Sequence, residues 1–321
     1  MWIATQTKYD WQQYSVIQLD FSSLSVGSVE ALEATLSNEL ELIGKRFNID
    51  ITKEVFASRK IKLLIEELSL KNRVAILIDE YDYPLLSNLN RPEIAEAIRE
   101  VMKDFFTAIK SCTTKDQIHA IFVAGVTKFS KTSLFSGFNN LSDITMRPEA
   151  AALLGYTEPE LHHYFSDYVG EFARKEGVTT PSIFSSLKEW YNGYRFSKDE
   201  IKIYSPYSII FALLRQELSN FWLRSGTPTF LIKLLQIQYY EIESISQMKL
   251  SEDNLDVFDI GTLPLIPILF QAGYLTISEY DAATKTYTLD HPNAEVREAF
   301  TWYVLSTRIR RTKKQEIMAK N

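Results

Sequence analysis

An unbroken apolar run, Val74 to Ile78, is followed directly by two acids, Asp79 and Glu80. The run is too short for a helix and is typical of a β-strand that is buried on both faces. Strands of this kind occur in parallel sheets, where polar chemistry gathers at the carboxyl ends of the strands. The run therefore predicts an α/β fold that has Asp79 and Glu80 at the functional edge of its sheet.

The segments around this run alternate between strand-like and helix-like patterns. Strands are predicted at Val16 to Phe21 and, as a second buried strand, at Ile118 to Ala124; helices are predicted at Ser28 to Phe47, Val55 to Leu68 and Ile94 to Ile109. The helices show apolar residues at three- or four-residue spacing, and Ser28 is a suitable N-cap for the first. Alternating strands and helices predict a mostly parallel sheet with right-handed connections.

The rest of the chain follows two further patterns. Helices are predicted at Glu158 to Glu176, Ile183 to Trp190, Tyr207 to Leu218 and Pro228 to Gln238. The next predicted elements are a helix at Leu263 to Gln271 and a hairpin with strands Tyr274 to Ser278 and Thr286 to Leu289. A last helix is predicted after Pro292, with Val296, Phe300 and Tyr303. We therefore expect an α/β core at 1–150, a helical subdomain at 151–250, a small winged-helix-like unit at 255–307 and a basic tail at 308–321. Both the winged unit and the tail, with its basic run Arg308 to Lys314, leave open whether they contact DNA or an acidic partner.

The composition limits the classes of protein. A chain of 321 residues exceeds what one simple core holds, so several subdomains are expected. A net charge of −6 argues against a surface that binds nucleic acid as a whole, although a local basic patch stays open. The lone Cys112 cannot form an internal disulfide, and no apolar stretch is long enough to span a membrane. We predict a cytoplasmic protein that does not enter a membrane.

The two acids after Val74 to Ile78 suit one kind of chemistry in particular. In ATPases, an acid at the end of a buried strand holds Mg²⁺ beside the nucleotide. Asp79 would bind Mg²⁺, directly or through a water, and Glu80 would orient and deprotonate the attacking water. The alternative is that both acids only end the strand, with Asp82 turning the chain into Pro84.

A phosphate-binding loop is the missing counterpart. The pattern Gly-x-x-x-x-Gly-Lys-Ser/Thr wraps phosphates in backbone N–H groups, and it does not occur in this sequence. Gly125 to Thr132 comes near to it but has Ser130 in place of the second glycine. That glycine adopts a backbone conformation unfavourable for other residues, so the segment is a poor phosphate loop. Thr127 or Lys128 at the end of this strand is better interpreted as a sensor of the γ-phosphate.

Five segments follow one another in a fixed order: Leu19-Asp20-Phe21-Ser22, Leu77-Ile78-Asp79-Glu80-Tyr81-Asp82, the long segment Gly125 to Leu141, Trp190-Tyr191-Asn192-Gly193-Tyr194-Arg195-Phe196 and Tyr204-Ser205-Pro206-Tyr207-Ser208. Taken together in this order, they resemble a bacterial family of predicted AAA-ATPases. The resemblance runs from about residue 14 to about residue 305. It implies an AAA-like ATPase core followed by a helical region, with ATP and Mg²⁺ as cofactors of complete members.

The resemblance also implies roles for single residues. Asp79 and Glu80 match the Walker B position, Thr127 falls near the sensor position, and Arg195 is either a phosphate-facing arginine or an ordinary packing residue. Family members normally begin with a P-loop segment and often end in a PD-(D/E)XK nuclease-like domain. This chain is expected to lack both, which makes its core an incomplete P-loop NTPase-like sheet. We therefore expect a truncated or degenerate ATPase domain, inactive without the loop; the alternative is a non-catalytic module that binds protein or nucleic acid.

Overall fold

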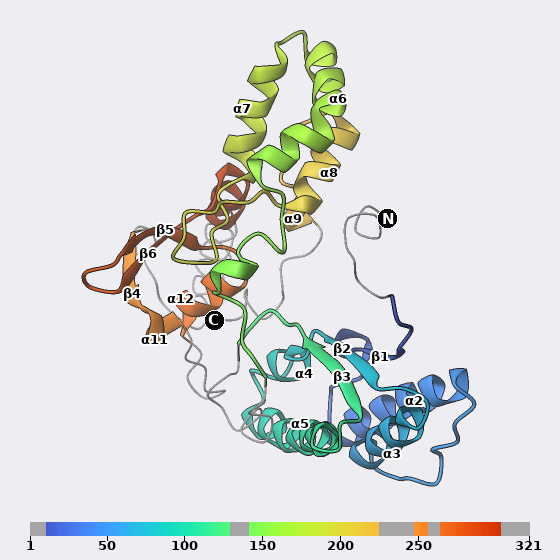
Figure 1. Ribbon diagram of the computed structural model, residues 1–321. Coiled ribbons are helices and arrows are strands. Elements are labelled where there is room, and N and C mark those ends of the chain that lie inside the picture. The colour runs from blue at the N-terminus through green and yellow to red at the C-terminus, as the bar shows by residue number, and fades with distance from the viewer. Residues whose placement is uncertain (1–10, 129–140, 225–246, 256–263, 303–321) are drawn as a thin grey trace, which may run out of the picture. The chain divides into compact units, whose positions relative to one another are not determined.

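The computed structural model describes residues 11–128, 141–224, 247–255 and 264–302 (Figure 1). The chain divides into two compact units, one of residues 1–139 with 259–261 and one of the remaining residues. Both units combine helices with a three-stranded sheet. Within the described residues, no helix has both the length and the apolar character needed to cross a bilayer.

The first unit is a parallel α/β layer. Its elements are β1 (Ser15–Asp20), the 3₁₀ turn η1 (Phe21–Ser23), α2 (Val29–Arg46), α3 (Ala57–Ser69), β2 (Val74–Asp79), α4 (Tyr83–Leu86), α5 (Pro92–Thr113) and β3 (Ile118–Val123). The strands pair in parallel in the order β1-β2-β3, with Ile17 opposite Ile76 and Leu77 opposite Phe122. The predicted strand–helix alternation and parallel sheet are confirmed.

The helices of this unit form for the reasons expected from the sequence. The Ser28 hydroxyl accepts the N–H of Ala31 at 3.2 Å and caps α2. The apolar stripe of α2 is buried, as is that of α5; the residues are Leu32, Leu36, Leu40 and Ile43 in α2 and Ile98, Met102, Phe105, Phe106 and Ile109 in α5. Figure 1 shows α2, α3 and α5 gathered on the same side of the sheet.

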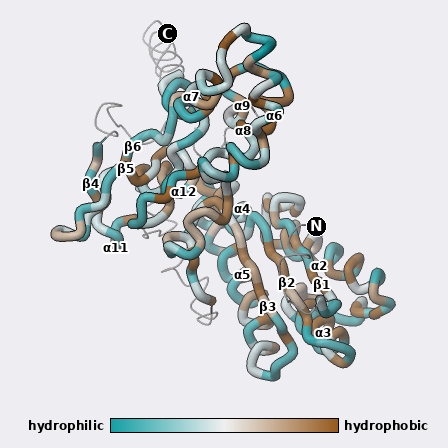
Figure 2. The backbone as a smooth tube through the Cα atoms, turned by 45° about the horizontal axis from the view of Figure 1, so that its top comes forward, coloured by the Kyte–Doolittle hydropathy of each residue, from teal (hydrophilic) through white to brown (hydrophobic). Residues whose placement is uncertain are grey.

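The burial of the strands corrects one prediction. Side chains of β1 and β2 that face the helices are fully buried, including Ile17 and Ile76. On the opposite face, Val16, Leu77 and Phe122 are 42%, 40% and 48% exposed. Val74 to Ile78 is therefore buried on one face only, although Figure 2 colours much of β2 as hydrophobic. No residue of β3 is fully buried. Among the described residues of this unit, long helices cover one face and β3 is an edge strand, so the prediction of two fully buried strands was wrong.

The second unit begins with helices. They are α6 (Glu158–Glu176), α7 (Thr180–Tyr191), α8 (Pro206–Arg215) and α9 (Phe221–Arg224), preceded by the 3₁₀ turn η2 (Pro148–Ala150). Thr157 and Glu160 form a capping box at the start of α6, and Gly177 ends it with φ of 69°. A positive φ suits glycine because it lacks a Cβ. These helices share one apolar core that includes Leu187, Tyr191 and Tyr204.

A small antiparallel sheet completes the second unit. Its strands β4 (Met248–Ser251), β5 (Thr276–Asp281) and β6 (Thr286–Asp290) pair in the order β4-β6-β5, beside α11 (Glu252–Leu255) and α12 (Leu265–Gln271). Residues 294–302 are helical. The predicted helix Pro228 to Gln238, Tyr303 and the basic tail lie outside the described residues. The domain boundaries at 150, 250 and 307 stay predictions.

An acidic edge on the parallel sheet

Acidic side chains end two neighbouring strands of the parallel sheet. Asp20 is the last residue of β1, Asp79 is the last residue of β2, and the two are register partners. Both side chains are exposed, and Glu80 follows directly as a half-buried residue. The strands thus bring Asp20, Asp79 and Glu80 to one carboxyl edge, as parallel topology requires. We call these three residues the acidic edge.

Glu80 sits in a sharp backbone turn. Its φ is 51°, in the left-handed region, which costs a residue with a Cβ about 1–2 kcal/mol. The N–H of Glu80 donates to Asp79 Oδ1 at 3.0 Å, and its carbonyl accepts the N–H of Tyr83 at 2.9 Å. The turn is therefore held by local hydrogen bonds in spite of its strain, and it is where the strand stops.

The carboxyl of Glu80 is electrostatically disfavoured as an anion. Burial raises its pKa, and the charges of Asp82, Asp79 and Asp20 raise it further, in that order. Within the described part of the chain, its carboxylate accepts no hydrogen bond and pairs with no cation. A carboxyl with a raised pKa is a better proton acceptor near neutral pH than an ordinary one, once it is ionised.

Asp82 and Thr127 follow the ends of β2 and β3, but both are buried. Asp82 is 0% exposed and Thr127 is 3% exposed. The Thr127 hydroxyl donates to Asp82 Oδ2 at 2.5 Å, and the Thr127 N–H donates to the same oxygen at 2.6 Å. The structure thus brings Thr127 to the correct end of the sheet but directs its hydroxyl to a protein carboxylate. Its role as a sensor stays a prediction.

Arg195 lies in the second unit and is 3% exposed. Its Nε donates to the carbonyls of Ser197 at 3.1 Å and Asp199 at 2.9 Å, Nη1 donates to that of Ser278 at 3.4 Å, and Nη2 donates to that of Lys198. The guanidinium therefore organises its own loop against β5. This geometry supports the packing alternative for Arg195, and its phosphate-facing role stays a prediction.

Sequence reasoning missed two further buried groups. Glu295 is 0% exposed; its carboxylate accepts the Ser208 hydroxyl at 2.7 Å and the Trp222 N–H at 2.9 Å. Asp82 was interpreted only as a turn residue before Pro84. The sequence carries one weak signal for Asp82: an additional acid follows the pair Asp79-Glu80 on the turn into α4, which begins with Tyr83-Pro84.

The part of the chain that the structure describes contains no set of three or more His, Cys, Asp or Glu side chains arranged to hold a metal ion. The acidic edge still fits Mg²⁺ bound through waters, because carboxylate oxygens are its preferred protein ligands and it keeps several waters. The side chains of Asp79 and Glu80 are carboxylates and offer no hydrogen-bond donor to a phosphate oxygen. The Glu80 N–H already donates to Asp79 Oδ1. It fits the metal half of a nucleotide site and not the phosphate half.

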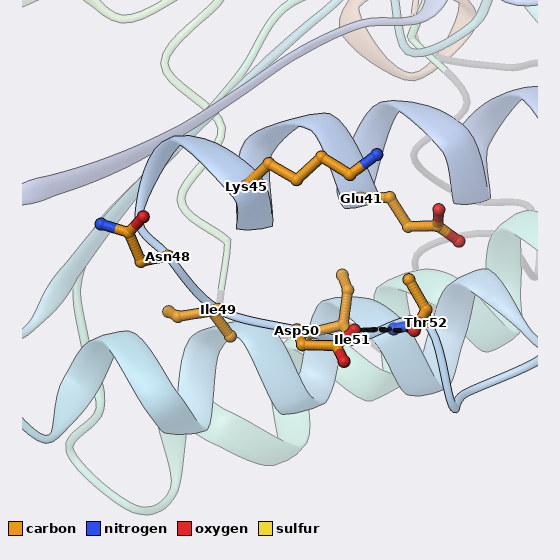
Figure 3. A pocket seen from close by; sticks show the side chains of 7 residues that line it. All are labelled: Glu41, Lys45, Asn48, Ile49, Asp50, Ile51 and Thr52. Carbon is orange, nitrogen blue, oxygen red and sulfur yellow. Dashed lines mark hydrogen bonds between the residues drawn. The ribbon is translucent and has the colours of Figure 1, made fainter.

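A surface hollow of about 390 Å³ lies elsewhere in the first unit, at the end of α2 (Figure 3). It is lined by Glu41, Lys45, Asn48, Ile49, Asp50, Ile51 and Thr52. Asp50 is bound to Thr52, with the Thr52 N–H donating to Asp50 Oδ1 at 3.0 Å. None of the predicted site residues lines this hollow, so it adds nothing to the acidic edge.

The region predicted to be winged-helix-like has one property that bears on DNA binding. The helix before its hairpin, α12, has all of Leu265 to Phe270 buried. A recognition helix reads base edges with exposed polar side chains. From Leu265 to Phe270, α12 offers none.

Comparison with known proteins relates the first unit to a described family. Residues 1–135 match the family model described as "Predicted AAA-ATPase". A curated protein of Azotobacter chroococcum mcd 1, described as an uncharacterized protein in the vnfD 5' region, is 31% identical over 294 residues. The match covers 90% of this chain and 54% of that protein, so the chain spans about half the length of the relative. No solved structure matches.

Proposed function

Residues 1–135 belong to the family of predicted AAA-ATPases, and on that premise we propose that the acidic edge is the Mg²⁺- and water-binding half of an ATP hydrolysis site. Asp79 binds Mg²⁺ through a water, and Glu80 orients and deprotonates the attacking water. The first unit is then a P-loop NTPase-like core. The second unit combines a helical subdomain with a winged-helix-like sheet.

One observation carries this proposal. Glu80 is a half-buried carboxyl beside Asp79, in a strained turn, with no hydrogen-bond donor and no cation among the described residues. A glutamate that only ended a strand would relax into solvent or find a donor. Strained, unpaired and electrostatically disfavoured groups are typical of reactive sites.

The chemistry divides between the two acids. A bound Mg²⁺ would neutralise phosphate charge and offset the repulsion at the acidic edge. Asp79, exposed at the strand end, would hold a metal-bound water. Glu80 would take the proton of the attacking water, because a raised pKa makes its carboxylate a stronger base than an ordinary glutamate. Phosphate contacts are not assigned, because the sequence holds no phosphate-loop pattern.

Paramagnetic Mn²⁺ in place of Mg²⁺ tests the proposal directly. Mn²⁺ should broaden the amide NMR signals of Asp79 and Glu80 first, and ATP should lower the Mn²⁺ concentration required. Asp79→Asn should weaken the effect by about tenfold, the loss expected for one charged ligand contact of about 1.4 kcal/mol. Asp104→Asn, in α5, is the matched control and should change nothing. Equal broadening in wild type and Asp79→Asn, or none at the edge, would refute the metal site.

A non-catalytic interaction module is the second candidate. The exposed side chains Tyr207, Ile210 and Leu214 are 41%, 46% and 74% accessible and form one apolar stripe on α8. Exposed apolar stripes at helical spacing are typical of protein docking surfaces. Protein, more than DNA, suits this surface, because α12 offers no base-reading side chain from Leu265 to Phe270. Loss of all metal and nucleotide binding would favour this candidate.

A further inference from the structure

Asp82 joins two segments that are far apart in sequence. It follows the acidic edge at the start of α4, and its carboxylate accepts three hydrogen bonds from the loop after β3. The Val126 N–H donates to Oδ1 at 3.1 Å, while the Thr127 N–H and hydroxyl donate to Oδ2 at 2.6 and 2.5 Å. We call Asp82 together with Val126 and Thr127 the loop latch.

The neighbouring contacts are close and run in both directions. The Tyr81 hydroxyl donates to the Thr127 carbonyl at 2.7 Å, and the Tyr81 N–H donates to the Ala124 carbonyl at 3.1 Å. A Cβ on Gly125 would lie 2.4 Å from Asp82 Oδ1 and 2.7 Å from the Tyr81 ring. Only a glycine fits at this point, because any larger residue would push the loop away from the carboxylate.

The charge of Asp82 is held by dipoles and not by a counter-ion. No Lys or Arg pairs with Asp82 in the described ranges, and the side chain is 0% exposed. Burial raises the pKa of Asp82, and the hydrogen bonds from Thr127 and Val126 oppose that rise. A buried carboxylate that depends on three aimed donors has a narrowly defined position, since loss of one donor leaves charge unsatisfied.

The position of the latch matters for Glu80. Glu80 lies two residues before Asp82, with φ of 51°, and its carbonyl binds Tyr83. The left-handed turn is therefore fixed at both ends, by Asp79 on one side and by the latched segment Tyr81 to Tyr83 on the other. A strained residue persists only where its surroundings over-determine it.

We infer that Asp82 is a positioning residue that holds the Glu80 turn in place through the loop latch. This inference deepens the proposed function, on which it rests, by naming the contact that orients the water-activating carboxyl. It also assigns Thr127 a role in that latch, through its hydroxyl and N–H. The mechanical link between the β3 loop and Glu80 is independent of any metal or nucleotide.

The test compares two substitutions of Thr127 in the full chain without Mg²⁺ or ATP. Thr127→Val removes the hydroxyl donor with little change of shape, and Thr127→Ser keeps it. The readout is the Cα chemical shift of Glu80 in protein with ¹³C-labelled glutamate, because that shift depends on φ. The Glu80 signal is assigned by its loss in Glu80→Gln.

Thr127→Val should move the Glu80 Cα shift away from its wild-type value and speed amide exchange at Val126 by about tenfold, as expected for loss of one hydrogen bond to a charged group. Thr127→Ser should restore both. Asp82→Asn should act in the same direction and more strongly. Ile98→Val, a core change in α5, is the control for mere destabilisation and should leave the Glu80 shift unchanged.

An unchanged Glu80 shift in folded Thr127→Val, or an equal shift in Ile98→Val, would overturn the inference. If Asp82→Asn does not fold, the Thr127→Val and Thr127→Ser pair still decides. Because the measurement involves no ligand, its failure leaves the proposed ATP role standing. Failure of Mn²⁺ binding likewise leaves the latch intact.

Discussion

Glu80 in the first unit and Glu295 in the second unit both have a raised pKa, but their surroundings differ. Glu295 is fully buried and accepts hydrogen bonds from Ser208 and Trp222, which oppose the effect of burial. Glu80 is half buried, and three other acids repel its charge. Among the described residues, none donates a hydrogen bond to its carboxylate. The same pKa direction therefore marks a structural group in one place and a candidate reactive group in the other.

The residues around Glu295 are closely packed and hydrogen-bonded to one another. Asn192 and Gly193 abut Pro292 and Asn293, and the Asn293 side chain donates to the Asn192 carbonyl at 3.0 Å. Arg195 is satisfied by carbonyl oxygens in the same unit. Every one of these groups has a protein partner. The comparison predicts that changes around Glu295 alter stability, whereas changes at the acidic edge alter ligand binding.

The largest effect is expected at Gly193. Its φ is 107°, and a Cβ there would lie 1.9 Å from the Pro292 carbonyl oxygen. Gly193→Ala should destabilise the second unit by about 4 kcal/mol or more, since both strain and overlap oppose it. Chemical denaturation followed by tryptophan fluorescence measures this.

Gly170, in α6, is the matched control because nothing lies within 4 Å of a Cβ built there. Gly170→Ala should stabilise by about 0.5–1 kcal/mol, the ordinary helix preference for alanine. Similar effects at Gly170 and Gly193 would show that the close packing of the second unit is not as described.

Removal of the Glu295 carboxylate should be the next largest effect. Glu295→Ala leaves the Ser208 hydroxyl and the Trp222 N–H without an acceptor in a buried place. The expected loss is about 2–4 kcal/mol in the free energy of unfolding. Glu298→Ala, an exposed residue three positions further on, should change stability by about 0.5 kcal/mol or less. Equal losses at the two positions would contradict the structural role of Glu295.

The pH dependence of stability separates the charge of Glu295 from its shape. Its pKa in the folded state lies above the ordinary value of 4.5. Between pH 4.5 and that higher pKa, the folded state keeps a proton that the unfolded state has released. The stability from this group is present below pH 4.5 and is lost as the pH rises through the folded pKa. Glu295→Gln should flatten this part of the pH profile. An unchanged profile would show that Glu295 is not buried as a carboxyl.

The smallest effect sharpens the comparison because it has the opposite sign. Glu80→Gln removes a charge that burial and three acids disfavour, so it should stabilise the first unit at neutral pH. The gain should be only about 0.5 kcal/mol, because solvent screens a half-exposed charge. Thermal unfolding of Glu80→Gln beside Glu295→Ala measures the gain in one variant and the loss in the other. Destabilisation by Glu80→Gln would mean that Glu80 has a structural partner.

Local patterns predicted much of the first unit. The run Val74 to Ile78, the Ser28 cap and the helical stripes depend on neighbours in sequence, and the structure confirms them. The acids at the strand end followed from parallel topology. Exposure of Leu77 and Phe122 could not be predicted, because a single apolar run does not reveal how many faces of the sheet are covered.

The contacts that decide residue roles could not be predicted, because they join residues that are far apart in the sequence. Asp82 binds residues 44 and 45 positions away, and Glu295 binds Ser208 at a separation of 87. No local spacing encodes such partners. The sequence therefore indicated which residues carry charge, while the fold determined that Asp82 and Glu295 are held by donors and that Glu80 is not.

Mg²⁺-dependent ATP binding to wild type, Asp79→Asn and Glu295→Gln tests the central claim most directly. Equilibrium dialysis of ATP with a chain of this sequence should give weak binding, with a Kd of about 1 mM, because the sequence contains no phosphate-loop pattern that would add contacts. That binding should require Mg²⁺, fall in Asp79→Asn and persist in folded Glu295→Gln. Absence of Mg²⁺-dependent binding in wild type, or equal binding in Asp79→Asn, would contradict the assignment of the acidic edge to ATP chemistry.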